Sequence, residues 1–172
     1  MTKDTNPVRA SIIEAFNGLI LSKRKLRPPV AEVLDKAGVA RSTFYEHFNS
    51  RDSLLITAIR GPLGVVADAV TGNGDSEKLS AVLSHFMENR RGAIEALDGA
   101  LSMRITRALA ELIADRSPGR SANSALHLAE IEIGFIRLWL KGDTPYAPRD
   151  LASLMIRSAD AMHLVMNATA VE

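Results

Sequence analysis

Apolar residues recur every three or four positions along most of this chain, and this spacing constrains the fold more than any other feature. Such a period is typical of one face of an α-helix, whereas a half-buried strand would alternate apolar and polar residues. No stretch of useful length shows that alternation. The sequence therefore predicts an all-α fold with about nine helices.

The start of the chain predicts three helices with recognisable ends. Asn6 is placed to cap the first helix, and Pro7 suits the first helical position because its missing N–H costs little there. The second helix follows Pro29 and ends at Gly38, a residue type that readily takes the left-handed conformation common at helix ends. A short third helix is expected at about 41–47.

The rest of the chain continues the helical pattern. A fourth helix begins near Asn49-Ser50, and Gly61-Pro62 is expected to break or kink it, because proline removes a helical hydrogen bond. "TGNGDS" at 71–76 reads as a turn. The remaining helices are expected at 77–90, 93–115, 122–141 and 148–169, and a division of 93–115 near Asp98-Gly99 stays open.

Charge divides the chain into two parts near residue 60. Residues 1–60 hold 10 Lys+Arg and 6 Asp+Glu (10 − 6 = +4), whereas residues 61–172 hold 11 and 14 (11 − 14 = −3), which sums to the net +1. A basic head on a mildly acidic body suits a polyanion-binding domain joined to a domain of another kind. We expect two domains, 1–60 and 61–172.

Several classes of protein are disfavoured by composition. The chain has no cysteine, so it has no disulfide, thiolate zinc site or thiol nucleophile. The four histidines lack metal-ligand spacing, and no nucleophile–base pair or phosphate-binding loop is present. We therefore expect no enzyme activity, cofactor or metal. No apolar run approaches the roughly 18 residues of a membrane span, and no signal peptide is evident, so a cytoplasmic location without a membrane partner is expected.

The stretch "AGVARSTFYEHFNSRDSLL" at 37–55 has the pattern of a helix-turn-helix, in which the second helix enters the major groove of DNA. On that short helix Phe44 and Phe48 are expected in the core and Tyr45 at the surface. Hydroxyl groups suit base edges, and basic or phenolic groups suit guanine or phosphate. The candidate DNA contacts are Lys36, Arg41, Ser42, Thr43, Tyr45, His47 and Arg51.

The same stretch strongly resembles the DNA-binding segment of the TetR family of bacterial transcriptional repressors. The family pattern is matched at Ala37, Gly38, Val39, Thr43, Tyr45, His47, Phe48, Arg51, Asp52 and Leu54. The resemblance covers residues 8–60, and beyond 61 it rests on helix count and order. It implies a three-helix DNA-binding head on a helical body, and a homodimer that binds a near-palindromic operator until a small-molecule effector enters the body.

Two positions depart from the family pattern. Pro29 and Ala40 stand where the family often has a helix-capping hydroxyl, and a lost cap costs about 1 kcal/mol. We expect weaker anchoring on the DNA backbone, or a shift of contacts to Arg27, Lys36 and Arg41. The alternative is a sensor of the same fold, for a small molecule or a protein, that no longer binds DNA.

The last two expected helices are too apolar around their circumference to bury only one face, so one face requires a partner. Gly134 would let another helix approach closely. A four-helix interface between two copies follows, as in the family, with a thick-cored monomer as the alternative. The candidate interface residues are Ile131, Gly134, Phe135, Leu138, Met155, Met162 and Met166.

A ligand pocket in the body is expected to be modest, because few residues remain to enclose it. Its candidate residues are side chains able to offer polar or polarisable contacts among apolar neighbours. These are His85, Met103, Arg107, His127 and Trp139. Solvated or core roles for the same side chains are the alternative, and the sequence defines no ligand class.

Overall fold

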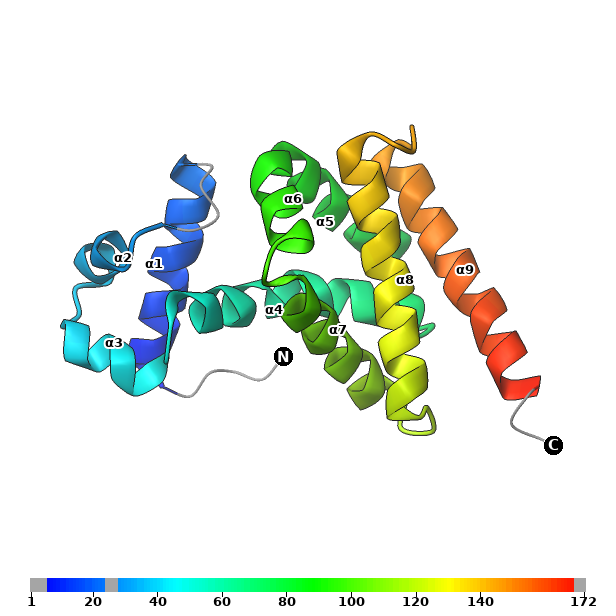
Figure 1. The fold of residues 1–172 in the computed structure, drawn as a ribbon, viewed down its shortest axis with the longest axis horizontal. Coiled ribbons are helices and arrows are strands. Elements are labelled where there is room, and N and C mark those ends of the chain that lie inside the picture. The colour runs from blue at the N-terminus through cyan, green and yellow to red at the C-terminus, as the bar shows by residue number, and fades with distance from the viewer. Residues whose placement is uncertain (1–5, 24–27, 169–172) are drawn as a thin grey trace. The chain divides into compact units, whose positions relative to one another are not determined.

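The computed structural model describes residues 6–23 and 28–168. Within those residues there are nine helices and no strand, so the predicted all-α fold is confirmed (Figure 1). The helices are α1 (Pro7–Lys23), α2 (Val30–Ala37), α3 (Arg41–His47), α4 (Arg51–Val70), α5 (Ser76–Glu88), α6 (Arg90–Asp98), α7 (Ser102–Arg116), α8 (Ala122–Lys141) and α9 (Pro148–Ala168).

The chain forms two compact units that meet between Ile59 and Arg60. Unit 1 holds α1, α2, α3 and the first part of α4, and unit 2 holds the remainder of α4 and the five helices that follow. Each unit has its own buried apolar residues.

The helix ends in unit 1 follow from local chemistry. Asn6 caps α1, since its Oδ1 accepts the backbone N–H groups of Val8 and Arg9 at 3.0 and 3.2 Å. Gly38 ends α2 in the left-handed conformation at φ 67°, and the Val39 N–H then donates to the Leu34 carbonyl at 3.2 Å. Both predictions for these ends are confirmed, and the Gly38 turn is what sets α3 after α2.

The core of unit 1 contains side chains from all four of its helices. Ile12 and Phe16 of α1 are fully buried, as are Val33 of α2, Phe44 of α3 and Leu54 of α4. A helix as short as α3 is marginal alone, because helix nucleation is costly. Its stability therefore comes from this packing.

The predicted break of the fourth helix at Gly61-Pro62 is wrong, because α4 runs from Arg51 to Val70 with Pro62 inside it, whereas the alternative of a kink stays a prediction. Proline costs a helix about 3 kcal/mol or more. The apolar residues that follow it, including Leu63 and Val66, are buried in unit 2. That burial offsets the local cost, so the helix continues.

In unit 2, α7 packs along α8, and α5 packs along α9. The open question at Asp98-Gly99 is resolved as a division, since α6 ends at Asp98 and α7 begins at Ser102. The second part of α4 is tied to α7 by two ion pairs, one between Arg60 and Glu111 at 3.1 Å and one between Asp68 and Arg116.

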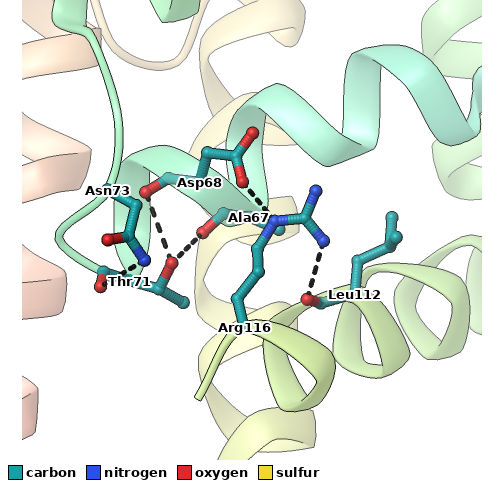
Figure 2. Close-up of polar contacts among 6 residues, drawn as sticks. All are labelled: Ala67, Asp68, Thr71, Asn73, Leu112 and Arg116. Carbon is teal, nitrogen blue, oxygen red and sulfur yellow. Dashed lines mark hydrogen bonds and ion pairs between the residues drawn. The ribbon is translucent and has the colours of Figure 1, made fainter. Parts of the chain in front are cut away.

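Figure 2 shows the second of these ties. The Arg116 guanidinium donates through Nε to Asp68 and through Nη1 to the Leu112 carbonyl at 3.0 Å, so one side chain links the end of α4 to α7. The Thr71 hydroxyl donates to the Ala67 carbonyl at 2.8 Å and closes the last turn of α4.

By length and composition α4 is apolar enough to cross a membrane, and it alone meets that test among the described helices. This finding corrects the expectation that no stretch of about 18 residues is apolar enough. In the folded chain 44% of that apolar stretch is buried, as in a helix that contributes to a protein core. We therefore attach no membrane role to it.

Candidate nucleic-acid interface

The short helix α3 divides its side chains between two faces. Phe44 is fully buried and Phe48, directly after the helix, is 3% exposed, whereas Tyr45 is 48% exposed. The Phe44 ring lies 5.7 Å from the Phe48 ring and meets the Tyr45 ring edge-on at 5.2 Å. The predicted division of the three aromatic residues is confirmed, and the buried pair fixes how the other face is presented.

The outward face of α3 carries hydrogen-bonding groups. Arg41, Ser42 and Tyr45 are exposed and Thr43 is partly exposed. The Arg41 guanidinium lies over the Tyr45 ring, with its carbon 5.9 Å from the ring centroid. Such a cation–π contact, one helical turn apart, holds the two side chains on the same face.

The other predicted contacts lie at the borders of this face. His47 is the last residue of α3 and Arg51 the first of α4, and both are partly buried. Lys36 of α2 is exposed, but its Nζ lies close to Gly18 of α1, so close that a side chain in place of Gly18 would collide with it. Its ammonium group therefore lies against α1. Arg27 lies outside the described residues.

Missing helix caps and one negative charge in unit 1 disfavour the binding of phosphate. Ala40 precedes the helix with extended backbone angles suited to a cap, yet it offers no side-chain hydrogen bond, and Pro29 offers none to α2. Glu46, which the sequence reasoning passed over, is exposed and adds a negative charge to α3. Glu46 directly follows Tyr45 in a helix whose inward face is marked by Phe44 and Phe48. This position in the sequence already predicts an outward-facing side chain.

The residues predicted to line a pocket are distributed over three helices of unit 2 and differ in exposure. Met103 and Arg107 of α7 and His127 of α8 are exposed. His85 of α5 is partly exposed, with its Nδ1 4.0 Å from a Glu88 carboxylate oxygen. Trp139 is buried, and its indole N–H donates to the Tyr146 carbonyl at 2.7 Å. These positions do not form one group of inward-facing polar side chains.

The predicted interface residues separate into surface and core. On α8, Ile131 and Leu138 are exposed and Phe135 is partly exposed, at helical spacing along one face. An added Cβ at Gly134 would meet nothing within 4 Å. Met155 of α9 is fully buried in its own chain, so it contributes to the core and cannot contact a partner.

On α9 the predicted Met162 is partly exposed, and the Met166 side chain lies outside the described part of the chain. Two neighbouring residues that the prediction omitted are far more exposed, Leu164 at 72% and Val165 at 65%. Their place near the end of α9 adds a second exposed apolar segment to unit 2.

The sequence reasoning also missed Glu132 of α8 and Thr106 of α7. Both side chains are buried, at 0% and 1% exposure, and their oxygens have no hydrogen-bond partner. Glu132 occupies a position of the buried stripe of α8, four residues after Leu128 and four before Ile136. The sequence signal for a buried Glu132 is a charged residue at an inward-facing position among the apolar residues of a helix.

Comparison with known proteins finds this fold in a solved structure. No family model and no curated protein matches the chain. The structure of a TetR transcriptional regulator from Rhodococcus sp. RHA1 is similar, with a TM-score of 0.61 and 18% sequence identity over 93% of this chain and 97% of that chain. A likeness at this identity establishes the all-helical fold over nearly the whole chain, and the function must be argued from the residues.

Proposed function

We propose that this chain is a transcriptional regulator that binds duplex DNA through α3. The observation that carries the proposal is the outward face of α3, where Arg41, Ser42, Thr43 and Tyr45 are presented by a helix that Phe44 anchors in the core. The helix-turn-helix arrangement and the fold shared with a TetR transcriptional regulator support it. We further propose a cytoplasmic repressor that acts as a homodimer on a near-palindromic operator.

The residues of α3 have separate tasks in this proposal. Thr43 and Ser42 donate to or accept from base edges in the major groove, where each base pair has a distinct pattern. Arg41 and Tyr45 bind phosphate or guanine from the same face, while His47 and Arg51 bind phosphate at its borders. Lys36 adds positive charge nearby and sets no sequence preference.

Substitutions on α3 separate base reading from backbone binding. We expect Tyr45→Phe to weaken binding of all duplexes by roughly fivefold, because one hydrogen bond to phosphate is worth about 1 kcal/mol. Thr43→Ala is expected to weaken binding similarly and also to change which base is preferred, because each base contact discriminates by about 1–3 kcal/mol. Fluorescence anisotropy with duplexes enriched from a random pool measures both effects.

A matched control for charge comes from unit 2. Arg157 of α9 is exposed, so Arg157→Ala removes one positive charge from the surface of unit 2. Arg41→Ala should weaken binding at least about tenfold, while Arg157→Ala should change it less than about twofold. Equal losses in the two variants would mean that only net charge matters, and the assignment of α3 as the reading helix would be wrong.

We propose that two copies associate through the exposed apolar residues of α8 and α9. Ile131, Phe135 and Leu138 form an apolar row along α8, and Gly134 in that row leaves space for a partner helix. Exposed apolar patches on a soluble protein commonly mark interaction sites. The end of α9, with Leu164, extends the exposed apolar surface of the unit.

Leu138→Glu should convert this dimer to monomer. Burying an unpaired carboxylate in the interface costs several kcal/mol, so the dissociation constant should rise at least about a hundredfold. Analytical ultracentrifugation measures the change, and Met103→Glu is the control because Met103 is similarly exposed on α7. A dimer that persists in Leu138→Glu, or dissociates only in Met103→Glu, would place the interface elsewhere.

Unit 2 has the second task of binding a small-molecule effector that releases the DNA. The pocket residues predicted from the sequence are positions at which effector binding can be tested. They are His85, Met103, Arg107, His127 and Trp139. The observation that favours an inward-facing site is the buried pair of unpartnered polar side chains, Thr106 and Glu132.

A second candidate function, a sensor of the same fold that no longer binds DNA, is favoured by the missing caps at Pro29 and Ala40 and by the exposed Glu46. Ala40→Ser distinguishes the two candidates. Its hydroxyl would cap α3 and touch phosphate, so DNA affinity should rise by several-fold if the chain binds DNA. A sensor would show no duplex binding with either residue.

A further inference from the structure

Two polar side chains lie fully inside unit 2 without a partner. Thr106 and Glu132 are the only buried polar or charged residues in the part of the chain that the structure describes. The Thr106 Oγ1 and both Glu132 carboxyl oxygens make no hydrogen bond. Burying such groups unpaired is unfavourable, so a fold that retains both invites a functional explanation.

The two side chains lie at the same level of one helix pair. α7 and α8 pack along each other and are joined by residues 117–121, so they run antiparallel (Figure 1). Thr106 lies 13 residues before Gly119, the middle of that connection (119 − 106), and Glu132 lies 13 residues after it (132 − 119). Positions equidistant from the turn of an antiparallel pair have the same height along it.

The surroundings of the pair are apolar and include small side chains. Ala110 follows Thr106 by one helical turn, and Ala129 precedes Glu132 by one turn, and both are buried. Ile105 and Ile133, the chain neighbours of the pair, are buried as well. A ligand bound at this level of the helix pair would meet these apolar side chains and the oxygens of Thr106 and Glu132.

The chemistry of the oxygens selects the kind of ligand. A carboxylate accepts hydrogen bonds through both oxygens, and a threonine hydroxyl accepts through one. A primary ammonium presents three N–H donors and one positive charge, so it matches three acceptors and favours the ionised form of the Glu132 carboxyl, which releases its proton to solvent when the amine binds. A hydroxyl or an amide supplies fewer donors and no charge.

We propose that the effector is an amphipathic primary amine, whose ammonium group binds Glu132 and Thr106 between α7 and α8 while its apolar part contacts the surrounding side chains. This inference rests on the proposed function, because it gives the chemical class of the effector. Both groups are buried, so the amine can enter only when α7 and α8 separate. Because the amine binds only this separated conformation, it raises the population of that conformation.

The test uses the full chain without DNA and the single tryptophan of the sequence as its reporter. Trp139 is buried on α8, seven residues after Glu132 (139 − 132), which is about two helical turns. The probes are hexylamine, hexan-1-ol, hexanoate and hexyltrimethylammonium. Hexylamine should change the Trp139 emission in a saturable manner, with at least about tenfold higher affinity than each of the other three.

Two variants and one control locate the effect. Glu132→Gln keeps the shape but cannot ionise beside the ammonium group, and should weaken hexylamine at least about tenfold while leaving hexan-1-ol unchanged. Thr106→Val removes one acceptor and should weaken hexylamine about threefold or more. Glu130→Gln makes the same charge change on α8 at a partly exposed position and should have no effect. Circular dichroism establishes that each variant is folded.

Three results would overturn the proposal. They are the absence of a saturable response to hexylamine, equal affinities for hexylamine and hexan-1-ol, and equal hexylamine affinities in the wild-type chain and Glu132→Gln. Duplex binding by the same preparation is measured separately. If the chain responds to the amine but binds no duplex, the proposed regulator function is wrong. If it binds a duplex but does not respond to the amine, only the proposed effector class is wrong.

Discussion

Phe44→Ala is expected to unfold unit 1 and abolish DNA binding while unit 2 stays folded. Truncating a fully buried phenylalanine costs about 3–5 kcal/mol. At about 0.05–0.15 kcal/mol per residue, a unit of some sixty residues is stable by about 3–9 kcal/mol, so this loss removes all or a large part of its stability. Chemical denaturation followed by circular dichroism should show an early loss of helix, while the Trp139 emission from unit 2 changes only at higher denaturant.

Tyr45→Ala is the matched control for this prediction. Its ring is half exposed and contacts Phe44 only edge-on, so its loss should cost about 1 kcal/mol. Both variants should lose DNA affinity, but only Phe44→Ala should lose helix. If Phe44→Ala were as stable as Tyr45→Ala, the buried role of Phe44 in unit 1 would be wrong.

Glu132→Gln is expected to stabilise the chain, by an amount that grows with pH. Burial raises the pKa of the Glu132 carboxyl from 4.5 to about 8. Between these values the folded chain keeps a proton that the unfolded chain has released, so the free energy of unfolding falls as pH rises. Below pH 4.5 both states are protonated, and the penalty is absent.

The difference in the free energy of unfolding between Glu132→Gln and the wild-type chain isolates this effect from other ionisable groups. It should be near zero at pH 4.5 and reach about 3–5 kcal/mol at pH 8, because each pH unit contributes about 1.4 kcal/mol. Helices α5, α6, α7 and α9 pack against α8, and every charged side chain described on them is at least partly exposed. The cause of the raised Glu132 pKa is its own burial. Urea unfolding at a series of pH values measures the difference, and a constant difference would contradict a buried neutral carboxyl.

The sequence predicted unit 1 more fully than unit 2. Helical spacing was sufficient to separate Phe44 from Tyr45, because one short helix has one buried side. The same reasoning misassigned Met155, since periodicity finds an apolar face without showing whether the chain itself or a second copy covers it. Burial in the described chain decides that question.

Two other errors have physical causes. The break expected at Pro62 followed from a local rule that the burial of Leu63 and Val66 overrides. Glu132 was not predicted to be buried, although its place in the α8 stripe points inward. Both errors concern long-range packing, which local sequence patterns do not encode.

The central claim is that the outward face of α3 binds duplex DNA, and salt dependence tests it most directly. The duplex enriched most strongly from a random pool is titrated with wild-type chain and with Arg41→Ala. The wild-type affinity should fall at least about a hundredfold between about 50 and 200 mM salt, and Arg41→Ala should show a shallower dependence. Absence of enrichment at low salt, or the same salt dependence in both proteins, would contradict the claim.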